Sequence, residues 1–158
     1  MTTSVADVKA GTVHATVEIA APPAAVFRAL TDAQELETWW GSPELYQTHD
    51  YKLDLRVGGK WSALASGGGQ ESEVRGEYLA VDPPRLLECT WEPSWEQFRR
   101  TIVRYTLEPI PGGTRLTVLH RGFAGEEDCK DHAEGWQRVL EWLSGHLAGT
   151  RTPARAAR

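Results

Sequence analysis

The chain has 158 residues, of which 41% are hydrophobic and 25% are charged, and it carries a net charge of −5. This length and balance predict one globular domain with a single core. Basic residues are scattered among acidic ones, except for three arginines at the C-terminus, which argues against a nucleic-acid-binding surface.

Both ends of the chain are expected to lie outside the folded domain. Residues 1–11 lack the apolar run of a signal peptide, and no stretch of about 18 apolar residues occurs anywhere, so we expect a soluble, cytoplasmic protein without membrane insertion. Residues 149–158 have little to bury and are expected to be disordered. Residues 12–148 therefore form the predicted domain, preceded by a flexible N-terminus.

The predicted domain begins with a strand and two short helices. Apolar and polar residues alternate from Val13 to Ile19, which is the pattern of a strand with one solvent-facing side. Pro23 suits the first turn of a helix that follows directly. Thr31-Asp32 is suited to cap a second helix over residues 33–39, and Gly41-Ser42-Pro43 then ends the helical region.

The middle of the chain is rich in strands. Turns containing glycine or proline separate segments with strand-like composition at residues 45–57, 60–65, 73–81, 86–91, 100–108 and 114–121. Short strands joined by such turns predict an antiparallel meander, with about seven strands in total.

The last element has the period of a helix. Between about Gly125 and Ala148, apolar residues recur on one helical face, at Trp136, Val139, Leu140, Leu143 and Leu147. Such a helix is about 35 Å long, enough to cross a whole sheet. We therefore predict an α+β fold in which a curved antiparallel sheet wraps around the C-terminal helix.

Several motifs occur in an order that resembles a known family. They are Ala-Pro-Pro-Ala-Ala-Val-Phe after the first strand, Trp39-Trp40-Gly41, residues 55–61, Gly76-Glu77-Tyr78, residues 81–86, residues 113–117 and Gly135-Trp136. Over roughly residues 12–148 the chain resembles the activator-of-heat-shock-protein-90-ATPase-like branch of the START-like (SRPBCC) superfamily. The resemblance implies the helix-grip fold of Bet v 1 and START domains, with a pocket between sheet and long helix. Relatives include lipid carriers, polyketide cyclases and hormone receptors.

Strand parity and helix spacing predict which side chains reach such a pocket. The tryptophan pair at 39–40 precedes a chain break and suits a pocket entrance. Arg56 either pairs with Asp54 on the sheet surface or, if the strand bulges at Gly58-Gly59, contacts a ligand carboxylate or phosphate. The candidate ligand-binding residues are Trp39, Trp40, Arg56, Trp61, Tyr78, Trp91, Tyr105, His120, His132, Trp136 and Leu140.

His120 and His132 are also the candidates for catalysis. Imidazole titrates near neutral pH and suits general acid–base work, whereas the alternative is that each ring is a structural hydrogen-bonding group. Cys89 and Cys129 lack CxxC spacing, so we expect neither a disulfide nor a metal site, and nothing in the sequence indicates a cofactor.

The sequence is compatible with three functions. The sequence lacks a nucleophile elbow, a P-loop, a dinucleotide fingerprint and a His-Glu-x-x-His motif. We predict that the protein binds a small hydrophobic or aromatic molecule. The alternatives are a cyclase or dehydratase that uses pocket histidines, and a chaperone ATPase-stimulating or other interaction module, which the resemblance implies. The sequence leaves the oligomeric state undecided, and a homodimer is one of the alternatives.

Overall fold

The computed structural model describes residues 1–149, and the tail expected at 149–158 lies outside them except for Gly149. In chain order the elements are β1 (Thr2–Asp7), β2 (Thr12–Ile19), α1 (Pro23–Thr31), α2 (Ala33–Trp39), β3 (Gly41–Ser42), β4 (Tyr46–Leu53), β5 (Lys60–Gly67), β6 (Gln70–Asp82), β7 (Leu86–Pro93), the 3-10 turn η1 (Ser94–Glu96), β8 (Thr101–Ile110), β9 (Gly113–Arg121) and α3 (Glu126–Ala148).

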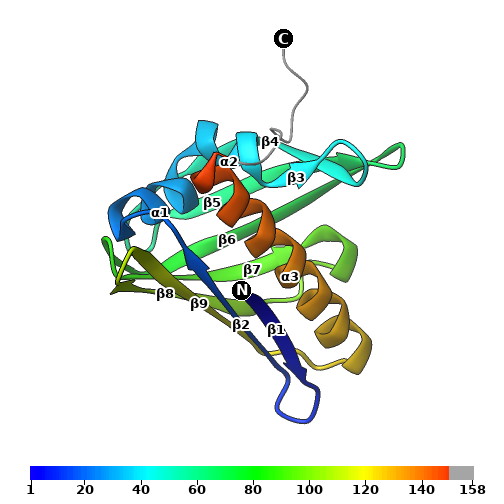
Figure 1. The fold of residues 1–158 in the computed structure, drawn as a ribbon. Coiled ribbons are helices and arrows are strands. Elements are labelled where there is room, and N and C mark those ends of the chain that lie inside the picture. The colour runs from blue at the N-terminus through cyan, green and yellow to red at the C-terminus, as the bar shows by residue number, and fades with distance from the viewer. Residues whose placement is uncertain (150–158) are drawn as a thin grey trace.

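The strands form one antiparallel sheet in the order β1-β2-β9-β8-β7-β6-β5-β4-β3. Figure 1 shows α3 running across one face of this sheet, with α1 and α2 near its C-terminal end. This is the predicted helix-grip arrangement, including the two short helices after the first predicted strand. No helix within residues 1–149 is long and apolar enough to cross a membrane.

The sheet has nine strands in the described residues, so the expected number of about seven was wrong. One addition is β1, which lies in the N-terminal segment 1–11 that was expected to be flexible. Its residues pair with β2 from Thr2↔Val17 to Asp7↔Thr12. A mostly polar strand on a sheet edge has no strong alternation, and its pairing with β2 decides its structure. The other addition, β3, has two residues.

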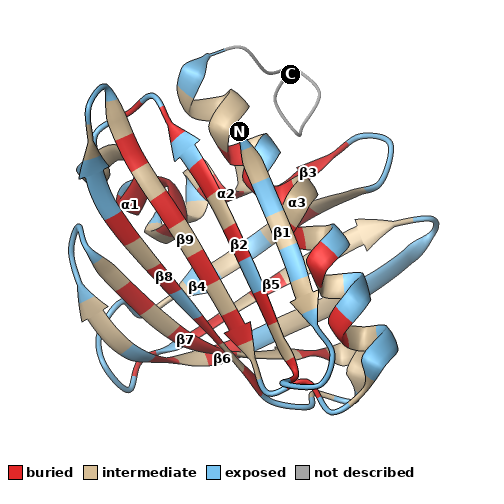
Figure 2. Cartoon of the chain, turned by 60° about the horizontal axis from the view of Figure 1, so that its bottom comes forward, coloured by how far each residue is buried: buried red, intermediate tan, exposed pale blue. Residues whose placement is uncertain are grey.

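Buried residues alternate with more exposed ones along β2, β8 and β9, as the colours in Figure 2 show. On β2 the predicted inward residues from Val13 to Ile19 are at most 1% exposed. The alternation places every second side chain between the sheet and α3, where apolar burial contributes about 25 cal/mol per Å². The core face of α3 consists of Cys129, Ala133, Trp136, Val139, Leu140 and Leu143.

The long helix is attached to the β1–β2 side of the sheet. The Ser4 hydroxyl donates a hydrogen bond to the Ala133 carbonyl at 2.6 Å, and the Gln137 side chain donates to the Thr2 carbonyl at 3.2 Å. The Cys129 thiol lies 3.3 Å from the Thr12 carbonyl. These contacts hold α3 toward one edge, and its opposite flank is free to face β4, β5 and β6.

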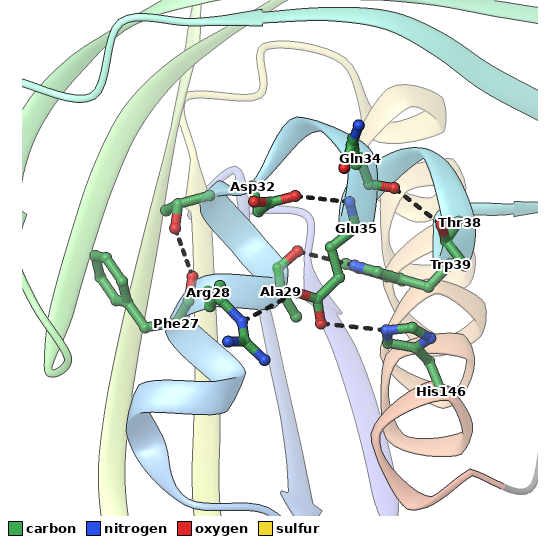
Figure 3. A network of polar contacts seen from close by, with 10 residues as sticks. Phe27, Arg28, Ala29, Asp32, Gln34, Glu35, Thr38, Trp39 and His146 are labelled. Carbon is green, nitrogen blue, oxygen red and sulfur yellow. Dashed lines mark hydrogen bonds and ion pairs between the residues drawn. The ribbon is translucent and has the colours of Figure 1, made fainter.

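A polar network joins the two short helices to the last turns of α3 (Figure 3). The Glu35 carboxylate lies 3.4 Å from Arg28 Nε and 3.3 Å from His146 Nε2. Asp32 caps α2 by accepting a hydrogen bond from the Glu35 amide at 2.9 Å. The Trp39 indole donates to the Ala29 carbonyl at 2.9 Å. This network fixes the end of α2, where Trp40 begins the wall of a pocket.

Candidate functional site

A pocket of about 540 Å³ lies between α3 and the β4–β7 part of the sheet. The exposed residues Leu45 and Trp95 belong to its lining, so the pocket reaches the protein surface. The lining residues are Trp40, Leu45, Tyr46, Thr48, Tyr51, Trp61, Ala63, Leu64, Ala65, Gly67, Gln70, Ser72, Val74, Trp91, Trp95, Glu96, Asp128, Asp131, His132, Gly135, Trp136, Arg138 and Val139.

Indole rings form one wall of the pocket. The Trp40 and Trp91 rings stack with centroids 6.1 Å apart and planes 22° apart. Trp61 lies 5.6 Å from Trp91, and Trp136 meets Trp40 edge-on at 5.8 Å. Such a cluster offers both faces and edges to a further ring, and aromatic pairs of this geometry contribute about 0.5–1.5 kcal/mol each beyond area burial.

His120 lies behind this wall and has all its hydrogen-bonding groups occupied. Its Nδ1 accepts from the Trp136 indole at 3.0 Å, so the ring proton is on Nε2, which donates to the Thr101 hydroxyl at 2.6 Å. That hydroxyl in turn donates to the Trp91 carbonyl at 3.2 Å. This series of hydrogen bonds positions Trp136 and Trp91 in the pocket wall. The fully buried His120 therefore has a structural role.

The burial of His120 predicts a stability loss in acid. Burial, reinforced by the nearby His132, lowers the pKa of His120 well below its ordinary value of 6.5. The unfolded chain therefore binds a proton at His120 that the folded chain does not bind once the pH falls below 6.5. We expect this difference in proton binding to leave the free energy of unfolding unchanged above pH 6.5. Below pH 6.5 it should reduce the free energy of unfolding by up to about 1.4 kcal/mol per pH unit.

Urea titrations between about pH 5 and pH 7.5 measure the effect. The comparison is the His120→Gln variant, which cannot titrate in this range but keeps a side-chain donor and acceptor. We expect its stability to fall less steeply with acid than that of the wild type. Parallel curves for the two proteins would contradict the assignment.

His132 belongs to the pocket lining and has a different environment. Its Nδ1 lies 2.8 Å from the Asp128 carbonyl, one helical turn back, and 3.8 Å from the Glu96 carboxylate. With Nδ1 directed at that carbonyl, Nε2 is the ring nitrogen that remains for a bound molecule. Burial raises the pKa of Glu96, while the charge of His132 opposes that rise. A histidine next to such a carboxyl group suits proton transfer to or from a bound molecule.

A second polar group lies two turns further along α3. Arg138 and Tyr46 both line the pocket, and Trp142 contacts each of them, edge-on to the Tyr46 ring at 5.7 Å and 5.8 Å from the Arg138 guanidinium carbon. Burial raises the pKa of Tyr46, and hydrogen bonds from Trp40 and Arg138, with the charge of Arg138, oppose the rise. The pocket thus has a cation at one end and carboxyl groups at the other.

The predicted site residues fall into three groups in the structure. Those that line the pocket are Trp40, Trp61, Trp91, His132 and Trp136. Those that are buried outside its lining are Trp39, Tyr78, Tyr105, His120 and Leu140. Arg56 lies on the exposed surface, where its Nε pairs with the Asp54 carboxylate at 2.9 Å, as the surface alternative predicted.

Sequence reasoning missed the polar lining of α3. Apart from His132, which was predicted, Asp128, Asp131 and Gly135 line the pocket in a stripe beside the buried one. Their spacing of three and four residues marks one helical face, but a mostly polar stripe also fits plain solvent exposure. Arg138, Tyr46 and Tyr51 carry no motif that would have marked them.

The structure indicates no metal or reactive thiol in the part of the chain that it describes. No group of three or more His, Cys, Asp or Glu side chains is placed to hold an ion within residues 1–149. Cys89 is buried, and this raises the pKa of its thiol to about 12, which keeps it protonated and inert at neutral pH.

Known proteins share both the sequence pattern and the fold. An uncharacterised protein of Mycobacterium tuberculosis is 29% identical over 164 residues, which cover 96% of this chain and 70% of that protein. The crystal structure of protein Ms6760 from Mycobacterium smegmatis is 25% identical with a TM-score of 0.79, covering 94% of this chain and 97% of the other.

A further solved structure carries the family name. The AHSA1 protein SPO3351 of Silicibacter pomeroyi is 31% identical with a TM-score of 0.74, covering 89% of this chain and 99% of the other. The family model described as Activator of Hsp90 ATPase homolog 1-like protein matches residues 20–148. The chain therefore belongs to the Activator of Hsp90 ATPase homolog 1-like family of the START-like superfamily.

Proposed function

We propose that the protein binds a small aromatic or otherwise hydrophobic molecule in the pocket between α3 and strands β4–β7. The observation that carries the proposal is that five tryptophans, Trp40, Trp61, Trp91, Trp95 and Trp136, line one open cavity of about 540 Å³. Small-molecule sites are typically apolar clefts of roughly 300–1,000 Å³ with a few polar groups that fix orientation.

The energetics favour a ligand with more than one ring. Burying roughly 150 Å² of aromatic surface contributes about 4 kcal/mol. Association costs on the order of 4–15 kcal/mol in lost translational and rotational freedom. A single ring therefore binds weakly, whereas fused or linked rings that contact several indoles, or a ring with an added polar contact, bind more tightly.

Thermal shifts with a panel of aromatic acids, neutral polycyclic compounds and fatty acids test the proposal. We expect at least one aromatic class to raise the melting temperature, by RT ln(1 + [L]/Kd) in free energy, and to change the fluorescence of the wall tryptophans. Native mass spectrometry after gentle purification should show a small molecule bound to the protein. Failure of every class to stabilise the protein, with no carried ligand, would contradict the proposal.

A second candidate function is an enzyme of the cyclase or dehydratase kind. The observation that favours it is the His132–Glu96 pair in the pocket lining, where both side chains are shielded from solvent, at 11% and 12% exposure. General acid–base groups in such a position accelerate proton transfers by about 10²–10⁴-fold. Mass spectra recorded after incubation with aromatic hydroxy-ketones distinguish the two functions, because an enzyme converts these compounds to dehydrated products and a carrier returns them unchanged.

A further inference from the structure

Buried donors without acceptors gather at the pocket. Among the described residues, two buried side-chain nitrogen atoms lack a hydrogen-bond partner, Trp91 Nε1 and Arg138 Nε. Both residues belong to the pocket lining. A buried donor without a partner costs about 1–3 kcal/mol, and more when it is charged. Their shared location points to a bound molecule with acceptor atoms.

Arg138 also has no ion-pair partner among residues 1–149. The ion pairs that arginines form within residues 1–149 involve Arg28, Arg56, Arg85, Arg100, Arg104, Arg115 and Arg121, and none includes Arg138. Its contacts are the Tyr46 hydroxyl and the Trp142 ring, which are both uncharged. This half-buried guanidinium beside aromatic rings therefore has no ion-pair partner in the described part of the chain, and a carboxylate could pair with it through two parallel hydrogen bonds.

The charges of the pocket are arranged along α3. Asp128 and Asp131 line the end near Glu96, and Arg138 follows Asp131 by seven residues, or about 10 Å along the helix axis. An anion is repelled at the first end and attracted at the second. The protein as a whole carries a charge of −5, so any preference for an anion must arise locally.

We infer that the pocket selects aromatic carboxylic acids, with Arg138 as the contact for the carboxylate and the indole wall as the contact for the rings. This inference rests on the proposed function and adds the substrate class. Tyr46 holds the guanidinium in place from β4, and the acidic end of the pocket sets the orientation of the ligand.

Paired probes of equal shape test the inference. Calorimetric titrations with 2-naphthoate and with the neutral 2-naphthamide should show that wild-type protein prefers the acid by about tenfold or more. The Arg138→Gln variant should lose this preference and still bind the amide. The Arg75→Gln variant is the matched control, because Arg75 stacks on Phe98 outside this pocket, and removing its charge should leave the preference intact.

If the Arg138→Gln variant does not fold, the Arg138→Lys variant tests the same contact. Lysine keeps the charge but not the planar pair of donors, so an intermediate preference is expected. Equal affinity for acid and amide in the wild type would overturn the inference and leave the proposed function standing. An acid preference that survives in Arg138→Gln would overturn the role of Arg138. If neither probe binds and no compound of the wider panel does, the proposed function fails as well.

Discussion

Replacing Gly76 by alanine is expected to destabilise the protein by about 2–4 kcal/mol, because the change forces an atom into the space where β6 crosses an indole. A Cβ at Gly76 would lie 2.0 Å from the Thr90 carbonyl oxygen and 2.4 Å from Trp61 Nε1. In the structure that indole donates to the same carbonyl at 3.1 Å. The glycine therefore lets a β5 side chain reach across β6 to β7.

The neighbouring contacts leave little room for relaxation. Gly76 pairs with Trp61 in the β5–β6 ladder, and the Glu77 amide donates to the Thr90 hydroxyl at 2.8 Å. Moving the indole away breaks its hydrogen bond and displaces one ring of the pocket wall, so ligand binding should weaken together with stability. Urea unfolding measures the first effect, and titration with the best ligand of the panel measures the second.

Gly135→Ala is the matched control for the stability measurement. Gly135 lies inside α3, and an added Cβ there meets nothing within 4 Å. The same chemical change should stabilise this helix by roughly 0.5–1 kcal/mol, because alanine has the higher helix propensity. A loss below about 0.5 kcal/mol in Gly76→Ala would mean that the sheet yields at this crossing and that the indole wall is not rigid.

The overall fold could be predicted because its strands and its long helix have strong periodic patterns of apolar residues. The alternation on β2 and the apolar stripe of α3 each require one buried face. On a strand, a register shift by one residue would expose all of the apolar side chains. The same parity correctly predicted burial of His120, which is fully buried. It could not reveal that Trp136 and Thr101 occupy both ring nitrogens, because these partners come from α3 and β8.

The position of the pocket depends on a contact that no periodicity encodes. Parity marks the inward side chains of the sheet but not the lateral position of the helix above them. The Ser4–Ala133 hydrogen bond holds α3 at the β1–β2 edge, and β1 itself escaped prediction. Consequently Tyr78 and Tyr105 point inward as expected yet lie buried outside the lining, whereas Tyr46 and Tyr51 face the space on the other side.

Filling the pocket from its floor should abolish binding without harming the fold. Ala63 lies on β5, is 3% exposed and belongs to the lining, between Trp61 and Ala65 on the same strand face. In Ala63→Phe a phenyl ring enters the space proposed for the ligand. We expect affinity for the best panel ligand to fall by about 100-fold or more, which corresponds to about 2.7 kcal/mol.

The stability of Ala63→Phe distinguishes an open pocket from a closed one. If water fills the cavity, the new ring replaces it and buries apolar surface, so the free energy of unfolding should stay equal or rise. Were the walls collapsed in solution, the same ring would overpack the core at a cost of about 1–3 kcal/mol. Ser62→Phe adds an identical ring on the opposite face of β5, beside Lys52 and Arg75, and should change neither affinity nor stability strongly. Undiminished binding in Ala63→Phe, with normal behaviour of Ser62→Phe, would place the ligand outside this pocket.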